Sequence, residues 1–166
     1  DTANFQRCLK FAGQLARANY LVTFGIKPRR PETGYGYIKC SRALKSADRI
    51  IALKVDKFTE KPDLKMAHRY LRSKDYFWNS GIFVWRICRI IEALKKYAPA
   101  LHQGLEEYLL LNDTKIFDRL PSMSIDYQVM EKAERIALVK ATFDWDDVGS
   151  WDALARHHPA DVRGNT

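Results

Sequence analysis

The sequence of 166 residues lacks any apolar run that approaches the roughly 18 residues needed to cross a bilayer, although 46% of its residues are hydrophobic. Its first residues, Asp1 to Phe5, also lack the charged segment followed by a hydrophobic one that marks a secretion signal. These two absences argue against a membrane protein and a secreted one. They predict a globular, cytoplasmic protein with no membrane partner.

Side chains that bind soft metals are few and poorly spaced. The three cysteines, Cys8, Cys40 and Cys88, are odd in number and lie in apolar or helical surroundings, which predicts reduced core thiols rather than disulfides. The four histidines offer no ligand spacing, and the pair His157 and His158 is typical of the solvated end of a helix. A zinc site is therefore not expected.

Positive charge is concentrated in one part of the chain. Residues 26–74 contain 14 Lys or Arg against 5 Asp or Glu, whereas the rest of the chain is nearly neutral. A nucleic acid, a nucleotide or a phosphorylated metabolite could each be attracted by this segment, and a solvated basic face would account for it equally well.

Hydrophobic periodicity alternates between that of helices and that of strands, and no internal repeat is found. This alternation predicts an α/β domain in which a sheet is flanked by helices, and strands that share a direction would bring their loops to one edge. Segment 78–85 is apolar on both alternations, which predicts a central strand buried on both faces. Helices are expected at 5–17, 63–72, 87–98, 101–109, 125–131 and 150–156, and strands at 20–24, 35–40, 51–55, 78–85 and 136–139.

An acidic turn lies between bulky aromatic residues near the end of the sequence. Asp144, Asp146 and Asp147 stand just before Gly149, with a phenylalanine and two tryptophans in the same segment. Crowded carboxylate oxygens suit a hard cation such as Mg²⁺, and the aromatic frame would restrict their motion. Acidic turns are also commonly just solvated, and the residue pattern alone leaves both interpretations open.

Four short segments stand out: Thr-Gly-Tyr-Gly-Tyr-Ile at 33–38, Phe-Thr-Glu-Lys-Pro at 58–62, Trp-Asn-Ser-Gly-Ile-Phe at 78–83 and Asp-Asp-Val-Gly-Ser-Trp at 146–151. In this order and spacing they closely resemble one enzyme family, the mannose-1-phosphate guanylyltransferases of the sugar nucleotidyltransferases. Two further segments, 22–28 and 124–132, resemble the same family, so that the likeness covers nearly the whole chain.

The resemblance implies both a fold and a reaction. The fold would be part of a Rossmann-like nucleotidyltransferase (nucleotide-diphospho-sugar transferase) fold, with a mixed sheet flanked by helices. The reaction would form GDP-mannose and pyrophosphate from mannose 1-phosphate and GTP, with Mg²⁺ as cofactor. Such a transfer depends mainly on positioning and electrostatics.

The resemblance also implies catalytic residues. Lys61 would bind the sugar phosphate as a compact positive charge, and Asp147 would hold the metal ion, its partner aspartate lying earlier in such enzymes. Asp146 and Asp144 are weaker candidates that would support the metal site from outside. Asp126 is expected only to cap its helix and is given no catalytic role.

The sugar itself would be bound by Gly36, Glu60, Asn79 and Ser80. Gly36 would let a hydroxyl reach the backbone, Glu60 would accept hydroxyl protons, Asn79 would distinguish epimers, and Ser80 would leave room for the ring. Glu60 and Lys61 can both face one ligand only if the strand ends there, as the following proline predicts. Without the resemblance, these residues would be a plain turn, a surface ion pair and a strand cap.

The chain also departs from the family pattern. Members carry a glycine-rich loop followed by arginine, and a first metal-binding aspartate, whereas the sequence contains no Gly-x-Gly-x-x-Arg run. Residues 1–166 are therefore expected to form the sugar-phosphate-binding C-terminal half of a nucleotidyltransferase domain, with the nucleotide-binding N-terminal half absent. Full activity is not expected from these residues alone.

Other functions stay open at this level. The chain could be a non-catalytic or regulatory relative, or could act on another hexose 1-phosphate, because neither the hexose nor the base can be derived from these residues. Binding of nucleic acid by residues 26–74 is disfavoured, because Glu60 and Asp147 would repel a phosphate backbone. The sequence leaves a homo-oligomer open.

Overall fold

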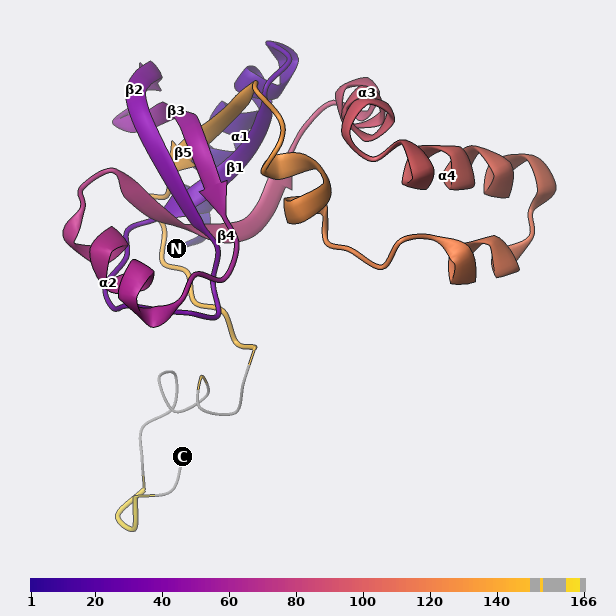
Figure 1. The fold of residues 1–166 in the computed structure, drawn as a ribbon. Helices are drawn as coiled ribbons and strands as arrows, with labels where there is room; N and C mark the ends of the chain where they lie inside the picture. The colour runs from indigo at the N-terminus through magenta and orange to yellow at the C-terminus, as the bar shows by residue number, and fades with distance from the viewer. Residues whose placement is uncertain (150–152, 154–160, 165–166) are drawn as a thin grey trace.

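A computed structural model describes residues 1–149, 153 and 161–164 of the chain (Figure 1). The helix expected at 150–156 lies, apart from residue 153, outside these described residues. The helices are α1 (Thr2–Arg17), α2 (Leu64–Arg72), α3 (Ile87–Tyr97), α4 (Pro99–Leu111), the 3₁₀ segment η1 (Thr114–Arg119) and the π-helical turn η2 (Asp126–Met130). The strands are β1 (Leu21–Ile26), β2 (Tyr37–Ala47), β3 (Ile50–Thr59), β4 (Tyr76–Val84) and β5 (Ile136–Lys140).

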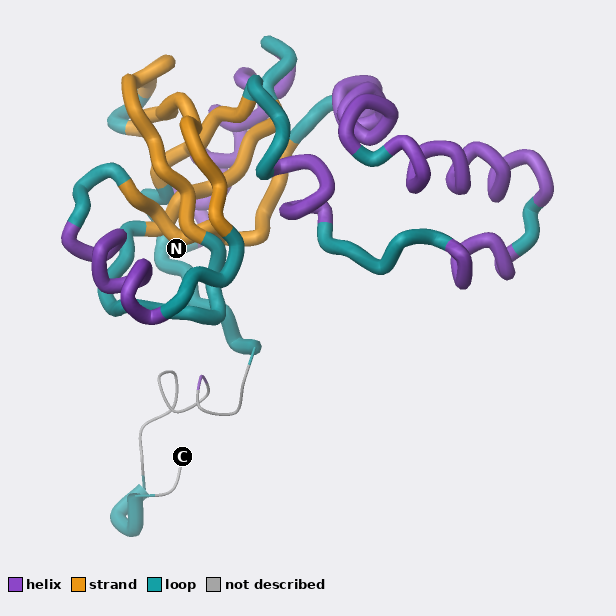
Figure 2. The backbone as a smooth tube through the Cα atoms, viewed as in Figure 1, coloured by secondary structure: helices purple, strands orange, loops and turns teal. Residues whose placement is uncertain are grey.

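The described strands form one mixed sheet that closes on itself in the order β1-β4-β2-β3-β5 (Figure 2). Strands β1 and β5 are parallel, and the other four pairings are antiparallel. The prediction of a mixed sheet flanked by helices is thereby confirmed. Shared strand direction, however, brings only the ends of β1 and β5 together, and antiparallel pairing positions the remaining loops.

The pairing register brings four separate segments to one end of this barrel. Ile26 at the end of β1 pairs with Trp78 in β4, and Trp78 pairs on its other side with Tyr37 at the start of β2. Tyr37 in turn pairs with Thr59, the last residue of β3. Since β5 runs parallel to β1, the chain leaves β1, β3 and β5 at this same end, near α2 (Figure 1).

Helix α1 packs on the barrel through one apolar face. Asp1 caps it by accepting a hydrogen bond from the Asn4 amide, and Phe11 and Leu15 are among the residues that it buries. The ring of Phe5, from the same helix, lies 5.1 Å from that of Phe143 in an edge-on contact. Helix α1 therefore supports the beginning of the acidic turn.

Two predictions about burial were wrong. Strand β4 does lie in the interior of the sheet, but the strand is buried on both faces only in its first half, since Gly81 is exposed. Cys88 is exposed, whereas Cys8 and Cys40 are buried as expected, and burial raises the pKa of Cys40 to about 12. In both segments, an apolar sequence pattern therefore predicted burial for a residue that is exposed in the structure.

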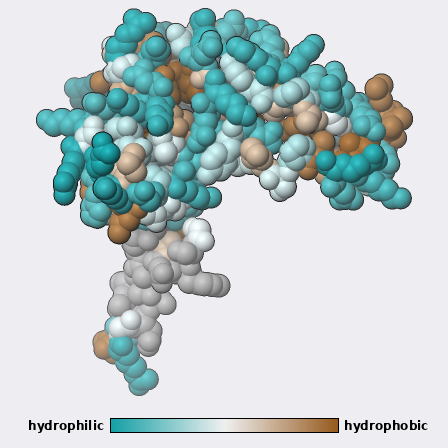
Figure 3. All heavy atoms as spheres, viewed as in Figure 1, coloured by the Kyte–Doolittle hydropathy of each residue, from teal (hydrophilic) through white to brown (hydrophobic). Residues whose placement is uncertain are grey.

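Residues 87–119, which contain α3, α4 and η1, form a helical arm that projects from the barrel (Figure 1). Helix α4 fully buries none of its residues, and Leu109 and Leu110 are 79% and 84% exposed. Apolar atoms are visible along this arm in Figure 3. Among the described residues, no helix combines the length and apolar character needed to cross a membrane.

Candidate functional site

Three of the predicted sugar-binding residues meet at the barrel end. A Cβ atom placed on Gly36 would clash with Oε2 of Glu60 and would lie 3.3 Å from Cβ of Asn79. The backbone N–H of Asn79 also donates a hydrogen bond to the backbone carbonyl of Gly36 at 2.8 Å. The absence of a side chain at Gly36 is therefore what allows these two side chains to approach its backbone.

Lys61 adds a positive charge to this group. Strand β3 ends at Thr59, and Lys61 has a left-handed backbone with φ of 45°. This bend breaks the strand alternation, and Lys61 Nζ lies 3.7 Å from Oε1 of Glu60 while most of its side chain is exposed to solvent. The expected end of the strand at this position is confirmed, and both side chains are available on the same side of the chain.

The side-chain amide of Asn79 is held by three partners. Its Oδ1 accepts from the Thr23 hydroxyl at 3.1 Å and from the Gly81 amide at 3.2 Å. Its Nδ2 donates to Oδ1 of Asp126 at 3.2 Å. Asn79 is therefore fixed in orientation by β1, by its own strand and by η2.

Asp126 belongs to the site, although it was expected only to cap a helix. It is the first residue of η2, which has no side-chain hydrogen bond at its N-cap, Ile125. Burial raises the pKa of Asp126, and hydrogen bonds from its own backbone N–H and from Asn79 partly counteract this. Burial also raises the pKa of Glu60, with the negative charge of Asp126 as the next contribution. We refer to Gly36, Glu60, Lys61, Asn79 and Asp126 together as the Gly36 cluster.

Ser80, the fourth predicted sugar-binding residue, is placed differently. It follows Asn79 in β4, and neighbouring residues of a strand point to opposite faces. Ser80 is buried, and its hydroxyl oxygen accepts a hydrogen bond from the Ile82 amide at 3.2 Å. It therefore shapes the strand beside the cluster, and a direct contact with sugar stays a prediction.

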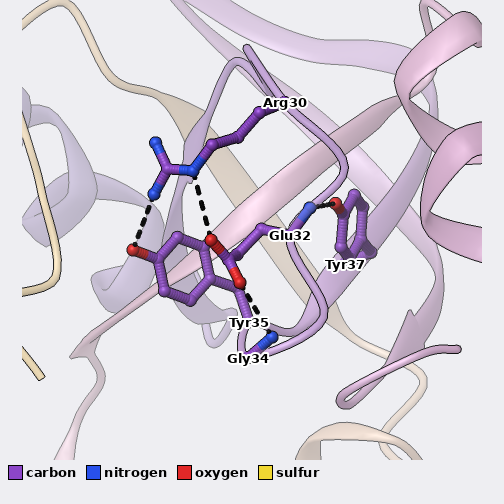
Figure 4. A network of polar contacts seen from close by, with 5 residues as sticks. All are labelled: Arg30, Glu32, Gly34, Tyr35 and Tyr37. Carbon is purple, nitrogen blue, oxygen red and sulfur yellow. Dashed lines mark hydrogen bonds and ion pairs between the residues drawn. The ribbon is translucent and has the colours of Figure 1, made fainter. Parts of the chain in front are cut away.

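A network of polar contacts holds the loop that leads to Gly36 (Figure 4). Glu32 accepts from Nε of Arg30 at 3.1 Å and from the Gly34 amide at 3.2 Å. Arg30 also donates to the Tyr35 hydroxyl at 3.3 Å, and the hydroxyl of the buried Tyr37 accepts from the Glu32 amide at 3.0 Å. The turn before Gly36 is consequently braced from both sides, and the basic residue Arg30 is part of its support.

Tyr35 connects this loop with the acidic turn. Its ring lies 5.3 Å from that of Trp78 and 5.5 Å from that of Trp145, both in edge-on contacts. Burial raises the pKa of Tyr35, Arg30 lowers it, and the charges of Asp146 and Asp147 raise it further. The acidic turn therefore lies at the same end of the barrel as the Gly36 cluster, one aromatic side chain away.

A cleft of about 510 Å³ opens beside this aromatic group, and it carries both charge signs. Asp144 and Asp146 line the cleft, whereas the carboxylate of the exposed Asp147 lies against Gly149. The remaining lining residues are Arg29, Arg30, Trp78, Phe143 and Trp145. The predicted aromatic frame around the carboxylates is thus present.

The carboxylates of the acidic turn fit Mg²⁺ in one particular way. Within the described residues, no group of three or more His, Cys, Asp or Glu side chains is arranged to hold a metal ion by itself. Mg²⁺ is commonly bound by one or two carboxylates together with substrate phosphates and water. Asp147 suits that open arrangement, in which phosphate oxygens supply further ligands, better than it suits a closed protein site.

Comparison with known proteins agrees with the fold. A family model described as nucleotidyl transferase matches residues 1–163, and the chain therefore belongs to the nucleotidyl transferase family. A solved structure from Thermus thermophilus, described as a mannose-1-phosphate geranyltransferase, is 36% identical with a TM-score of 0.83, covering 94% of this chain and 45% of its own. The expected α/β nucleotidyltransferase fold is confirmed.

Within that family, the chain is similar to proteins named as mannose-1-phosphate guanylyltransferases and to one named for xanthan biosynthesis. It is 39% identical to a mannose-1-phosphate guanylyltransferase of Klebsiella pneumoniae, over 97% of this chain and 36% of the relative. It is 41% identical to the xanthan biosynthesis protein XanB of Xanthomonas campestris, over 99% of this chain and 36% of the relative. The chain thus spans about a third of the length of these relatives, and the family resemblance read from its motifs is confirmed.

Proposed function

We propose that this chain binds mannose 1-phosphate and provides the sugar-phosphate side of a guanylyltransferase. In the reaction, a phosphate oxygen of the sugar phosphate attacks the α-phosphorus of GTP, and the bond from that phosphorus to the bridging oxygen breaks. The products are GDP-mannose and pyrophosphate. The observation that carries the proposal is the convergence of Gly36, Glu60 and Asn79 beside the Lys61 ammonium group.

Each member of the cluster has a role suited to its chemistry. The open backbone at Gly36 and the carboxylate of Glu60 receive sugar hydroxyls, and Asn79 donates its remaining N–H. The side chain of Lys61 is largely exposed to solvent beside Glu60, and its ammonium group offers one positive charge to the sugar phosphate. These residues act mainly by orienting the attacking phosphate, which is the main demand of phosphoryl transfer.

We propose Mg²⁺ as the cofactor, held by Asp147 together with substrate phosphates. When bound, the ion would neutralise phosphate charge and align the reacting groups. Asp144 and Asp146 add negative charge along the neighbouring cleft. GTP as the nucleotide, and a cytoplasmic location, belong to the same proposal.

Calorimetry tests the sugar-binding part directly. We expect Glu60→Ala and Asn79→Ala each to weaken binding of mannose 1-phosphate about tenfold. A hydrogen bond to a charged group such as Glu60 contributes about 1.5 kcal/mol or more, and loss of Asn79 leaves its buried partners unpaired at a cost of about 1–3 kcal/mol. Glu106→Ala is the matched control, since Glu106 lies in the helical arm and pairs with His102 at 3.4 Å. Equal binding by the unmodified chain and both cluster variants would overturn the assignment.

Lys61→Met separates recognition of phosphate from recognition of sugar. The unmodified chain is expected to bind mannose 1-phosphate more tightly than mannose, with an affinity that falls as salt concentration rises. In Lys61→Met we expect most of this preference and of the salt dependence to disappear, while mannose binds as before. An unchanged preference for the phosphorylated sugar in the variant would remove Lys61 from the phosphate site.

A further inference from the structure

We infer that Asp126 is a further specificity-determining residue of the sugar site: it fixes the Asn79 amide as a hydrogen-bond donor and, with Glu60, accepts hydroxyl protons of the sugar. This inference rests on the proposed function. It extends that function because it names a carboxylate from η2, whereas Asn79 lies in β4, Gly36 just before β2, and Glu60 and Lys61 just after β3.

The hydrogen bonds of Asn79 define its orientation without ambiguity. The Gly81 amide can only donate, and it lies 3.2 Å from one terminal atom of the side chain, which must therefore be the oxygen. Ionised Asp126 can only accept, and it lies 3.2 Å from the other terminal atom, which must be the nitrogen. The Thr23 hydroxyl shares its proton between Asn79 Oδ1 and the Ile82 carbonyl, both at 3.1 Å.

This arrangement limits what Asn79 can offer to a ligand. An amide side chain has two N–H donors and an oxygen with two lone pairs. Gly81 and Thr23 occupy the oxygen, and Asp126 takes one of the two N–H groups. Asn79 therefore retains one N–H for a sugar oxygen, and it cannot distinguish epimers by accepting a hydroxyl proton.

The acceptors of the cluster are the carboxylates of Glu60 and Asp126. Both are half-buried, burial raises the pKa of each, and an ionised carboxylate accepts about four hydrogen bonds. The Asp126 carboxylate accepts from Asn79 and from its own backbone N–H, and Glu60 pairs with Lys61 at 3.7 Å. Adjacent sugar hydroxyls would supply further hydrogen-bond donors to these carboxylates. Their hydrogen bonds would stabilise the negative charges of Glu60 and Asp126, which lie close together.

Glu131 serves as a control that separates the effect of nearby negative charge from the effect of the Asp126–Asn79 hydrogen bond. It lies at the end of η2, and its Oε1 accepts from the Glu60 amide at 3.2 Å. Its charge raises the pKa values of both Glu60 and Asp126, although it is not the largest contribution to either. Glu131→Gln thus removes one negative charge from the same neighbourhood and leaves the Asn79 bond intact.

The first test needs no ligand. We would follow the side-chain NH₂ resonances of Asn79 by nuclear magnetic resonance while the pH is lowered. The resonances should shift with a midpoint above the ordinary aspartate pKa of 3.8, because burial raises the pKa of Asp126. The charge of Glu131 raises it further, whereas the hydrogen bonds to the carboxylate and the charge of Lys61 lower it, and Glu60 is a second titrating carboxylate nearby. Asp126→Asn should abolish this transition and Glu131→Gln should retain it, whereas resonances that do not respond to pH would overturn the inference.

The second test measures specificity with mannose 1-phosphate and its analogues that lack one hydroxyl at C2, C3, C4 or C6. We expect Asp126→Asn to weaken binding of mannose 1-phosphate about tenfold. The variant should also lose discrimination against one of these analogues, because the bond from that sugar hydroxyl to the Asp126 carboxylate is then missing with either ligand. Glu131→Gln should keep both properties, and circular dichroism would verify that each variant is folded.

The possible results separate the two proposals. If the unmodified chain and Glu131→Gln bind, and Asp126→Asn binds equally well with the same analogue preferences, the role of Asp126 is wrong and the proposed function stands. If the unmodified chain does not bind mannose 1-phosphate, both are overturned.

Discussion

The barrel end and the helical arm differ in how their side chains are held. At the barrel end, residues far apart in sequence are fixed by strand pairing, such as Tyr37 with Trp78 and with Thr59. In the arm, α3 packs mainly on α4, α4 on η1, and several leucines remain exposed. A ligand site needs positions defined by several elements at once, and only the barrel end provides them among the regions compared.

The comparison also separates two meanings of an apolar sequence. The leucines at the end of α4 are as apolar as the leucine of β5, yet Leu110 is 84% exposed and Leu138 is fully buried. Burial follows from neighbours supplied by other segments, which a local pattern does not report. The contribution of an apolar residue to stability should therefore differ sharply between the two regions.

The largest effect is expected from truncating a leucine in the barrel. Leu138→Ala should lower the free energy of unfolding by about 2–5 kcal/mol, because it leaves a cavity in the closed sheet. Leu110→Ala, the matched change in the arm, should change it by less than about 0.5 kcal/mol. Chemical denaturation of the two variants measures both values, and similar losses would contradict the distinction between the regions.

A smaller effect, on binding rather than folding, is expected at Gly36. In Gly36→Ala the new Cβ meets the Glu60 carboxylate, which can move away, so that mannose 1-phosphate should bind roughly tenfold more weakly with little loss of stability. Gly13→Ala in α1 is the control, since its Cβ meets nothing within 4 Å. There the unfolding free energy should rise by about 0.5–1 kcal/mol with binding unchanged, as titration calorimetry and denaturation would show.

A change of about 1 kcal/mol is expected from Tyr37→Phe. The variant keeps the buried ring and removes the hydroxyl that accepts from the Glu32 amide. The loop before Gly36 should then exchange its amide hydrogens faster, and thermal unfolding should occur at a slightly lower temperature. Unaltered exchange at Glu32 and Gly34 would show that this bond does not brace the loop.

The smallest effect is a pH dependence from the two carboxylates. Because the folded-state pKa values of Glu60 and Asp126 lie above their ordinary values of 4.5 and 3.8, the folded state holds more protons than the unfolded state in that window. Their contribution to the free energy of unfolding should be fully present below the ordinary values and should be lost as pH rises through the raised ones, by less than about 1 kcal/mol. Denaturation at several pH values should show that the free energy of unfolding declines less with rising pH in Asp126→Asn than in the unmodified chain. An equal decline in both would contradict a raised folded-state pKa of Asp126.

Local patterns were sufficient to predict most elements. The period of apolar residues predicted α1, α3 and α4. The helix expected from residue 63 is α2, and Asp63 caps it by accepting from the Met66 amide at 2.7 Å. The second strand was predicted far too short. Its hairpin turns at Asp48 and Arg49, both with positive φ, and neither residue is the glycine that usually signals such a turn.

The site was only partly predictable, because motifs name residues and pairing places them. Gly36, Glu60 and Asn79 were expected to converge, and the register of β2, β3 and β4 brings them together. Asp126 was missed, since its contact with Asn79 joins positions 47 residues apart and leaves no local signal. The only sequence signal near this carboxylate is the resemblance of residues 124–132 to the guanylyltransferase family.

The account depends most directly on mannose 1-phosphate binding at the Gly36 cluster. We would map backbone and side-chain amide resonances of the chain as this sugar phosphate is added. The account predicts saturable shifts at Gly36, Glu60, Lys61 and Asn79, with none at the exposed end of α4. Shifts confined to other regions, or no saturable shift at any concentration, would contradict it.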